Sequence, residues 1–327
     1  MERILALVVS HNRHAQLVNC IEAIRRQTIQ PEAILVVNNG SSDYTSVWLD
    51  KQEDIIHICQ ENAGSAGGFA VGLEWAHKYG FTWTWCMDDD GYAADNALEK
   101  LLEQKLDQPI LINSAVINME DKKSFVWKTS NYKTLADVQE EVVSGVARPF
   151  NGSLIHRKVV EVVGLPKKDL FCRGDEAEYF YRITRAHKIK AVTVTSSIYY
   201  HPPRKFSYTK EWSLDTSWST YYHVRNKLAI LSSKYPIKIA AFFAYLFFVT
   251  KFIGSILLSQ RTQRFRKLAF VGNAFAHAIF GIYNTTPEKI QHKIKMQYTA
   301  PLWNMLASIC SNAMYALFMP KLAGVNK

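Results

Sequence analysis

The sequence is poor in cysteine, and the few cysteines that it has are scattered. The five are Cys20, Cys59, Cys86, Cys172 and Cys310. Their number is odd and no two form a C-x-x-C pair, which argues against a disulfide framework and a zinc site and fits the reducing cytosol. The N-terminus, MERILALVVSHN, also lacks the longer apolar core and small-residue cleavage site of a signal peptide. Its apolar run is expected to form a first strand.

Acidic residues are scarce in the C-terminal part of the chain. Residues 202–327 contain 17 Lys and Arg but only 3 Asp and Glu, whereas residues 1–201 contain 22 and 26. The net charge of +10 therefore comes from a mildly acidic part followed by a strongly basic, aromatic-rich part. This asymmetry indicates an anionic partner for the C-terminal part, either a membrane or a nucleic acid.

Internal repeats and low-complexity tracts are also lacking, and short apolar runs alternate with helical patterns instead. A helix is expected at about 14–27. This alternation predicts an α/β fold with a parallel sheet, whose ligands gather at the C-terminal ends of the strands. The predicted strands are ILALVVS (4–10), AILVVNN (33–39), DIIHICQEN (54–62) and FTWTWCM (81–87). Polar clusters follow each of them: Ser10 to Arg13, Asn38 to Gly40, Asn62 onward, and Asp88 to Asp90.

Three consecutive aspartates, Asp88, Asp89 and Asp90, follow the fourth predicted strand. Carboxylates this close repel one another, so folding them together costs free energy unless a cation is present. A hard divalent metal bound to a diphosphate would supply that cation with few protein ligands. The alternative is an acidic surface turn, because Asp-Asp-Asp-Gly is good turn sequence.

A glycine-rich segment, NAGSAGGF at 62–69, is expected to form a turn before a helix at about 67–79. Glycines let a backbone approach a ligand closely, and a helix start offers free N–H groups to an anion. The alternative is an ordinary strand-to-helix turn. The segment does not fit G-x-G-x-x-G, so a dinucleotide site is not favoured.

The segment CRGDEAEY at 172–179 predicts the start of a helix that continues to about residue 187. Asp175 and Glu176 then lie in its first turn, where the helix dipole favours the ionised form that a general base needs. Adjacent helix positions point about 100° apart, so the two side chains are not expected to face one substrate together. The alternative is plain charge complementarity at a helix N-terminus.

His201 follows an apolar, β-like run at 191–200, and a histidine at a strand end either binds a metal or is structural. An aromatic group that includes Trp212, Trp218 and Tyr222 follows it. Aromatic faces stack on sugar rings, but such residues at helix spacing also form protein cores.

A long apolar stretch at 239–258, IAAFFAYLFFVTKFIGSILL, matches the length of a bilayer span, although Lys251 weakens that interpretation. Basic residues flank it, and two more apolar patches follow at 268–283 and 302–319. This pattern predicts helices that lie on or dip into a membrane surface, with cations facing anionic lipid. The alternative is a helical subdomain packed on the preceding domain.

Several of these segments together resemble family 2 glycosyltransferases with the GT-A fold, over roughly residues 3–226. The glycine-rich segment, the triple aspartate and the acid-acid-Ala-Glu-Tyr motif make the chain most similar to bacterial galactofuranosyltransferases and related rhamnosyltransferases. The resemblance implies a GT-A domain at 1–226, with a Rossmann-like, mostly parallel mixed sheet flanked by helices. A basic, aromatic-rich helical region at 227–327 would associate with a membrane. The markers are VVSHNR (8–13), VVNNGSSDYT (36–45), NAGSAGGF (62–69), CMDDDG (86–91), FNGSLI (150–155), GDEAEY (174–179) and YYHVRN (221–226).

The resemblance also implies roles for the residues at matching positions. Asp88, Asp90 and His201 would bind Mn²⁺ or Mg²⁺, and His11 and Arg13 would lie by the nucleotide base and the diphosphate. The position of the family's base is Glu176, which is usually Asp, so Asp175 remains a candidate. Asn38 stands where many members carry an acid. The expected donor contacts are His11, Arg13, Asn38, Asn62, Gly67, Gly68 and Asp89.

These roles predict an inverting, metal-dependent glycosyltransferase. Its base would take a proton from an acceptor hydroxyl, whose oxygen would displace the nucleotide diphosphate from the sugar. UDP-galactofuranose is the expected donor, and dTDP-rhamnose is the alternative. The expected acceptor is a cell-surface glycan such as a lipid-linked polysaccharide of the O-antigen kind, contacted by Trp212, Trp218 and Tyr222. The enzyme would lie peripherally on the cytoplasmic face of the inner membrane, without a nucleic-acid partner, and its oligomeric state is left open.

Two other classes of protein are weighed against this prediction. A nucleotidyltransferase would also join an α/β sheet to an acidic metal site, but SHNRHAQ lacks the glycines of its N-terminal loop. A non-enzymatic basic module that binds membrane or nucleic acid would use the C-terminal charge but would leave the acidic centre unexplained.

Overall fold

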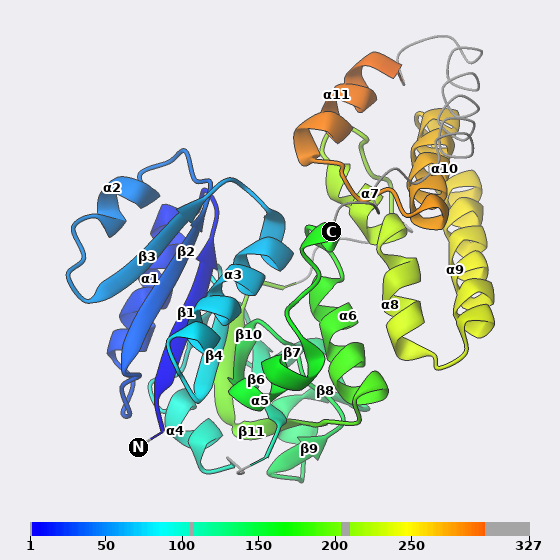
Figure 1. Ribbon diagram of the computed structural model, residues 1–327. Coiled ribbons are helices and arrows are strands. Elements are labelled where there is room, and N and C mark those ends of the chain that lie inside the picture. Colours follow the sequence, from blue (N-terminus) through cyan, green and yellow to red (C-terminus); the bar gives the residue numbers. More distant parts are fainter. Residues whose placement is uncertain (1, 105–107, 204–209, 298–327) are drawn as a thin grey trace, which may run out of the picture. The chain divides into compact units, whose positions relative to one another are not determined.

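The computed structural model describes residues 2–104, 108–203 and 210–297 (Figure 1). The chain forms two compact units, Met1–Lys205 and Phe206–Lys327. The boundary predicted at residue 226 lies about twenty residues after this division. The difference arises because helix α7 (Trp218–Arg225) packs on α10 (Arg264–Phe280) within the second unit. The aromatic segment before residue 226 therefore belongs to the helical unit.

The first unit is built on a mixed, mostly parallel sheet, as predicted. Its strands run in the order β3-β2-β1-β4-β10-β6-β11-β5, and β10 is antiparallel to both of its neighbours. The neighbours on either side of β10 run parallel to one another, so β1 to β4, β6 and β11 all end at one edge of the sheet. The strands are β1 (Ile4–Ser10), β2 (Ala33–Asn39), β3 (Ile55–Gln60), β4 (Trp83–Asp88), β5 (Tyr92–Ala93), β6 (Ile110–Asn118), β7 (Ser124–Thr129), β8 (Tyr132–Thr134), β9 (Val142–Ser144), β10 (Asn151–His156) and β11 (Lys190–His201).

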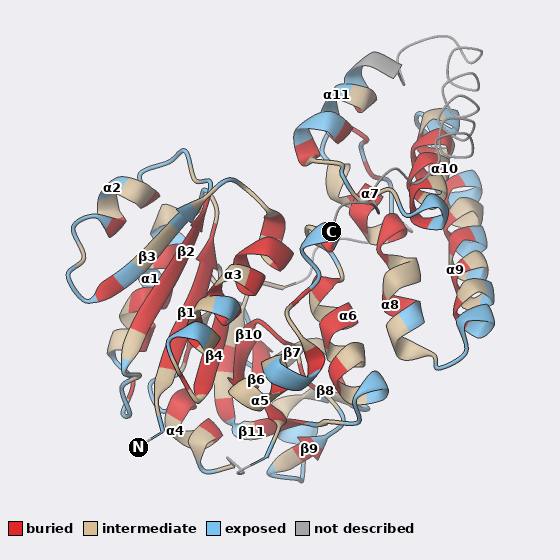
Figure 2. Cartoon of the chain, in the orientation of Figure 1, coloured by how far each residue is buried: buried red, intermediate tan, exposed pale blue. Residues whose placement is uncertain are grey.

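Helices cover both faces of this sheet, so its central strands are buried along most of their length (Figure 2). Helices α1 and α4 pack on one face with the even-numbered residues of β1, and α3, α5 and α6 pack on the other with the odd-numbered ones. Burial on both faces explains why the strands are continuous apolar runs and not alternating ones. The helices are α1 (His14–Arg25), α2 (Thr45–Leu49), α3 (Gly64–Lys78), α4 (Ala97–Leu102), α5 (Arg157–Val163) and α6 (Asp175–Tyr181), with short 3₁₀ segments at Leu135–Asp137 and Lys168–Leu170 and a π-helical turn at Arg182–Ala186.

The glycine-rich segment differs from its prediction. Helix α3 begins at Gly64, so Gly67 and Gly68 lie inside its first turns and not in a turn before it. A Cβ atom on Gly68 would come within 2.4 Å of Cγ1 of Val9. Gly68 therefore lets α3 pack closely against β1, and this contact alone accounts for a glycine there.

The second unit is helical, which agrees with the prediction for the C-terminal region. Its long helix α9 buries a stripe of five residues at spacings of three and four, which is one face of an α-helix. The predicted apolar patch at 302–319 lies outside the described residues. The helices are α7 (Trp218–Arg225), α8 (Lys227–Lys234), α9 (Lys238–Ser259), α10 (Arg264–Phe280) and α11 (Pro287–Gln297).

Candidate functional site

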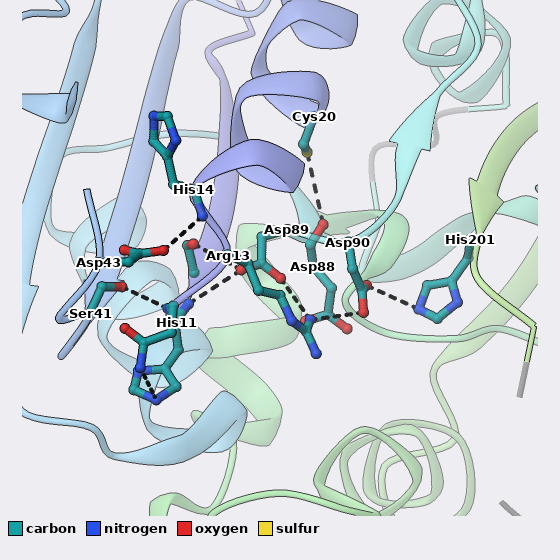
Figure 3. Close-up of polar contacts among 12 residues, drawn as sticks. His11, Arg13, His14, Cys20, Ser41, Asp43, Asp88, Asp89, Asp90 and His201 are labelled. Atoms are coloured by element: carbon teal, nitrogen blue, oxygen red, sulfur yellow. Dashed lines mark hydrogen bonds and ion pairs between the residues drawn. The ribbon is translucent and has the colours of Figure 1, made fainter. Parts of the chain in front are cut away.

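The three aspartates lie at the sheet edge where β1, β4 and β11 end (Figure 3). Asp88 is the last residue of β4, and it pairs across the sheet with Val9 just before the polar end of β1. His201 is the last residue of β11. The prediction that the three aspartates lie at the strand-end edge is therefore confirmed, and His201 lies at the same edge although more than 100 residues separate it from the acids.

Asp88, Asp90 and His201 together form a group able to hold a metal ion. One potential ligand atom from each lies within 4.8 Å of the other two. Oδ1 of Asp90 lies 3.3 Å from Nε2 of His201, and this buried oxygen makes no hydrogen bond of good geometry. Two carboxylates and an imidazole suit a divalent cation such as Mn²⁺, so the residues present fit the predicted metal.

The orientation of the His201 ring favours this role. Its Nδ1 lies 2.8 Å from the carbonyl oxygen of Pro202. A hydrogen bond there requires the proton on Nδ1, which leaves the lone pair of Nε2 directed to Asp90. Metal-binding histidines are commonly held in this way by a carbonyl behind the ring. The ring of Trp127 packs beside it, with centroids 4.8 Å apart.

Arg13 supplies positive charge to the acidic centre from within the chain. Its Nη1 lies 2.9 Å from Oδ1 of Asp89 and 2.8 Å from Oδ2 of Asp90. Oδ2 of Asp89 also accepts hydrogen bonds from the Ser10 hydroxyl and the His11 backbone N–H. The sequence indicated a metal as the compensating cation and Arg13 as a contact of the nucleotide, so the ion pairs of Arg13 with the acids and the contact of Ser10 were not predicted.

The three carboxyls differ in their electrostatics. Burial raises the pKa of Asp88 well above its usual value, and the neighbouring acids raise it further. Burial also raises the pKa of Asp89, because it outweighs the Arg13 charge and the Ser10 hydrogen bond. Burial would raise the pKa of Asp90 too, but a hydrogen bond from His201, when its Nε2 carries a proton, and the Arg13 guanidinium outweigh it, so this pKa is lowered. A cation bound at this centre would favour the ionised form of all three.

The predicted nucleotide contacts fall into two groups. His11 and Asn62 meet, with Nδ2 of Asn62 3.2 Å from Nε2 of the ring, while Nδ1 of the ring lies 2.9 Å from the carbonyl oxygen of Asn39. Asn38 instead bonds the following loop: its Nδ2 donates to Ser46 Oγ at 2.7 Å, and its Oδ1 accepts from the Ser41 N–H at 3.2 Å. Asn38 therefore shapes the loop after β2.

The structure distinguishes Asp175 from Glu176, which the sequence left as alternatives. Asp175 is buried and accepts a hydrogen bond of 2.8 Å from the Ser65 hydroxyl at the start of α3, and burial raises its pKa despite this bond. Glu176 is only partly buried, and its Oε2 accepts a hydrogen bond of 3.0 Å from Nδ2 of Asn151. The two carboxyls point to different partners, as their helix positions predict.

Asn151 reaches Glu176 from an irregular part of the sheet. The pairing of β10 with β4 shifts register between Asn151 and Ser153, and both Phe150 and Gly152 have positive φ, at 79° and 69°. A positive φ at a phenylalanine is strained, and such strain and bulges concentrate at functional sites. The motif FNGSLI contains the Asn-Gly signal for this bulge, but no role was predicted for Asn151.

The aromatic residues expected to stack on an acceptor are placed differently from that prediction. Tyr222 is buried in the helical unit, and its hydroxyl donates to the Thr285 carbonyl at 2.8 Å. Trp212 is buried as well, with Nζ of Lys267 4.9 Å from its ring centre. Neither ring has an open face for a sugar, because core packing occupies it. Trp218 is half-buried and packs edge-on against Tyr222.

The geometry predicts that Asp90→Asn weakens Mn²⁺ binding by about tenfold or more, since an amide oxygen replaces a charged ligand. Calorimetric titration with MnCl₂ measures this effect. Asp50→Asn is the matched control, because Asp50 is an exposed acid at the end of α2. Equal affinities for Asp90→Asn and the control would contradict the metal assignment.

Comparison with known proteins agrees with this site. The family model described as "Glycosyl transferase family 2" matches residues 6–164. Galactofuranosyltransferase GlfT1 of Mycolicibacterium smegmatis is 31% identical over 216 residues, which cover 62% of this chain and 71% of that protein. GlfT1 of Mycobacterium tuberculosis is 29% identical over 215 residues, which cover 62% of this chain and 70% of that protein.

Two solved structures share the fold at low sequence identity. The S. aureus TarS 1–349 complex with UDP-GlcNAc has a TM-score of 0.54 at 12% identity and covers 96% of this chain and 92% of that one. GalNAc-T7 with UDP, GalNAc and Mn²⁺ has a TM-score of 0.50 at 16% identity and covers 62% of this chain and 43% of that one. Two alternative classes, a nucleotidyltransferase and a non-enzymatic basic module, are not supported by these relatives, which are glycosyltransferases. The chain belongs to glycosyl transferase family 2, and it is a glycosyltransferase of the GT-A fold that is similar to galactofuranosyltransferases.

Proposed function

We propose that this enzyme transfers galactofuranose from UDP-galactofuranose to a hydroxyl of a cell-surface glycan, such as a lipid-linked polysaccharide, with inversion. The observation that carries the catalytic part is the placement of Glu176. It lies in the first unit with the acidic centre, where its charge contributes to the raised pKa of Asp88. The similarity to GlfT1 supports the choice of sugar.

Glu176 acts as the general base in this proposal. It is partly exposed, and its contact with Asn151 holds one carboxyl oxygen in place. It takes the proton of the acceptor hydroxyl while that oxygen attacks the anomeric carbon and the nucleotide diphosphate leaves. Asp175 suits this role less well, because it is buried and already accepts a hydrogen bond from Ser65.

The leaving diphosphate is the second charge that the site must stabilise. Asp88, Asp90 and His201 would hold Mn²⁺ or Mg²⁺, which neutralises negative charge on the leaving group when bound. Arg13 lies among the same acids and would add a hydrogen-bonding cation toward the diphosphate. His11 and Asn62 would line the nucleotide side of the site.

A panel of donors tests the proposed sugar. We expect faster nucleotide release from UDP-galactofuranose than from UDP-galactopyranose or dTDP-rhamnose, with Mn²⁺ and a glycan acceptor present. Release is measured with a coupled assay for the free nucleotide. A preference for dTDP-rhamnose would replace the galactofuranosyl proposal by the rhamnosyl alternative, and a preference for UDP-galactopyranose would reject both.

The variant Glu176→Gln tests the base. The amide keeps the shape and the contact with Asn151 but cannot take a proton, so transfer should fall by about 10²- to 10⁴-fold. The affinity for UDP with Mn²⁺, measured by calorimetry, should stay within about twofold of wild type. Asp175→Asn is the comparison variant and should retain far more transfer activity. If Asp175→Asn loses much more transfer activity than Glu176→Gln does, the base is Asp175.

We also propose that the helical unit attaches the enzyme peripherally to the cytoplasmic face of the inner membrane. Among the described residues, α9 is the one helix whose length and composition would suffice to cross a membrane. It packs one face into the helical unit and exposes Phe243 and Phe247 on another, with Nζ of Lys251 5.2 Å from the Phe247 ring centre. Exposed aromatic residues beside a cation suit an anionic lipid surface.

Sedimentation with lipid vesicles tests this attachment. The wild-type enzyme should pellet with vesicles that contain phosphatidylglycerol and much less with neutral phosphatidylcholine vesicles. The double variant Phe243→Ser, Phe247→Ser should lose most of this binding, because it removes the exposed aromatic area. Ile56→Ser, at an exposed apolar position of β3, is the control and should bind as wild type does. Unchanged binding of the double variant would refute the role of α9.

A further inference from the structure

A small pocket lies beside Glu176 in the first unit. Its volume is about 180 Å³, and its walls come from the segment 145–149 before β10 and from one side of α6. The segment includes Arg148 and Pro149, and the helix contributes Glu176, Ala177, Phe180 and Tyr181. Residues 176 and 180, and likewise 177 and 181, are four positions apart, so the four side chains form two neighbouring rows along this side of the helix.

Glu176 joins this pocket to the acidic centre. It lines the pocket and accepts the hydrogen bond from Asn151, which pairs across the sheet with Met87, the residue before Asp88. A group bound in the pocket would therefore have the base within reach, with the charged end of β4 nearby. This is the arrangement that an acceptor hydroxyl needs for attack on a donor sugar.

The lining suits a neutral sugar. Phe180, Tyr181 and the ring of Pro149 offer apolar surface for the C–H faces of a sugar ring. Arg148 and Glu176 offer a donor and an acceptor for hydroxyl groups. One guanidinium and one carboxylate make the lining neutral overall, which suits the sugar part of a glycan better than a diphosphate linker.

The size of the pocket restricts what can enter. Pockets for drug-sized ligands span about 300–1,000 Å³, which is larger than this one. A single sugar ring fits the smaller space better than a chain of several. Resting on the proposed function, we propose that this pocket binds the terminal sugar of the acceptor and that Ala177 determines how large that sugar can be.

Ala177 is the residue best placed to test the pocket. It is partly exposed, its side chain is a single methyl group, and it lies next to the proposed base. Ala177→Leu would add three carbon atoms inside the pocket on a helix that tolerates leucine well. Ala186→Leu is the matched control, because Ala186 is exposed at the end of the π-helical turn after α6 and does not line the pocket.

The first measurement is direct binding of sugars. Saturation-transfer NMR with a panel of methyl hexosides, in the presence of UDP and Mn²⁺, should give a signal for wild type and Ala186→Leu. The signal should fall by about tenfold for Ala177→Leu, since the added side chain occupies the space of the ring. Circular dichroism and UDP affinity should be equal in the three proteins, which separates loss of the pocket from loss of the fold.

The second measurement is turnover with UDP-galactofuranose. For Ala177→Leu, kcat/KM for the glycan acceptor should fall at least about tenfold, while hydrolysis of the donor by water stays within about twofold of wild type. Equal sugar binding by Ala177→Leu and wild type would overturn the pocket assignment, whichever donor is used. If Ala177→Leu loses sugar binding as expected but the wild-type enzyme does not turn over UDP-galactofuranose, the proposed donor is rejected and the pocket assignment is retained.

Discussion

Three adjacent carboxylates at the end of a buried strand must be compensated by positive charge and hydrogen bonds. Asp89 is almost wholly buried, and its two oxygens are taken by Arg13, the Ser10 hydroxyl and the His11 N–H. These contacts tie the end of β4 to the end of β1 and the start of α1. The hydroxyl of buried Tyr199 in β11 donates to the Asp88 carbonyl at 2.9 Å, which brings the strand that carries His201 to the same place. The grouping of Asp88, Asp90 and His201, which could hold a metal ion, is therefore a consequence of how the strand ends are joined.

A second constraint acts on the other side of the site. Phe150 holds a positive φ, and its ring stacks on Phe69 of α3 with centroids 4.0 Å apart. This packing helps to stabilise the irregular backbone that presents Asn151 to Glu176. Helix α6 starts after Gly174, whose φ of 109° is open only to glycine, and the turn places two acids in succession. Asp175 then binds Ser65 and Glu176 lines the pocket, so one helix start serves both structure and chemistry.

The helical unit is stabilised in a different way. Its sequence contains few acids, and its core includes charged groups that are buried against aromatic rings. Arg225 is fully buried between the rings of Tyr222 and Tyr283, and buried Lys267 is held by Glu211 and Gln260. Part of the aromatic richness of this region therefore stabilises buried cations, while the exposed part of α9 remains apolar. Composition alone does not distinguish these two uses, because both need aromatic residues beside basic ones.

The sequence by itself determined the first four strands of the first unit and the edge at which their polar residues meet. Apolar runs such as 4–10 and 33–39 coincide with β1 and β2, because strands buried on both faces need continuous apolar sequence. The position of the three aspartates after such a run indicated a cation site or an acidic turn, and the choice of Asp88 and Asp90 as metal ligands rested on resemblance. The pairing with His201 rested on resemblance, since no local pattern specifies a contact across more than 100 residues.

Only the tertiary structure decided what depends on packing between distant segments. It showed that Gly68 faces Val9, that Arg13 enters the acidic centre, and that Tyr222 and Trp212 are buried. It also separated Asp175 from Glu176, because their partners Ser65 and Asn151 come from elements far away in the chain. A sequence pattern reports which side of an element is apolar, but which residue lies opposite is set by how the elements pack together.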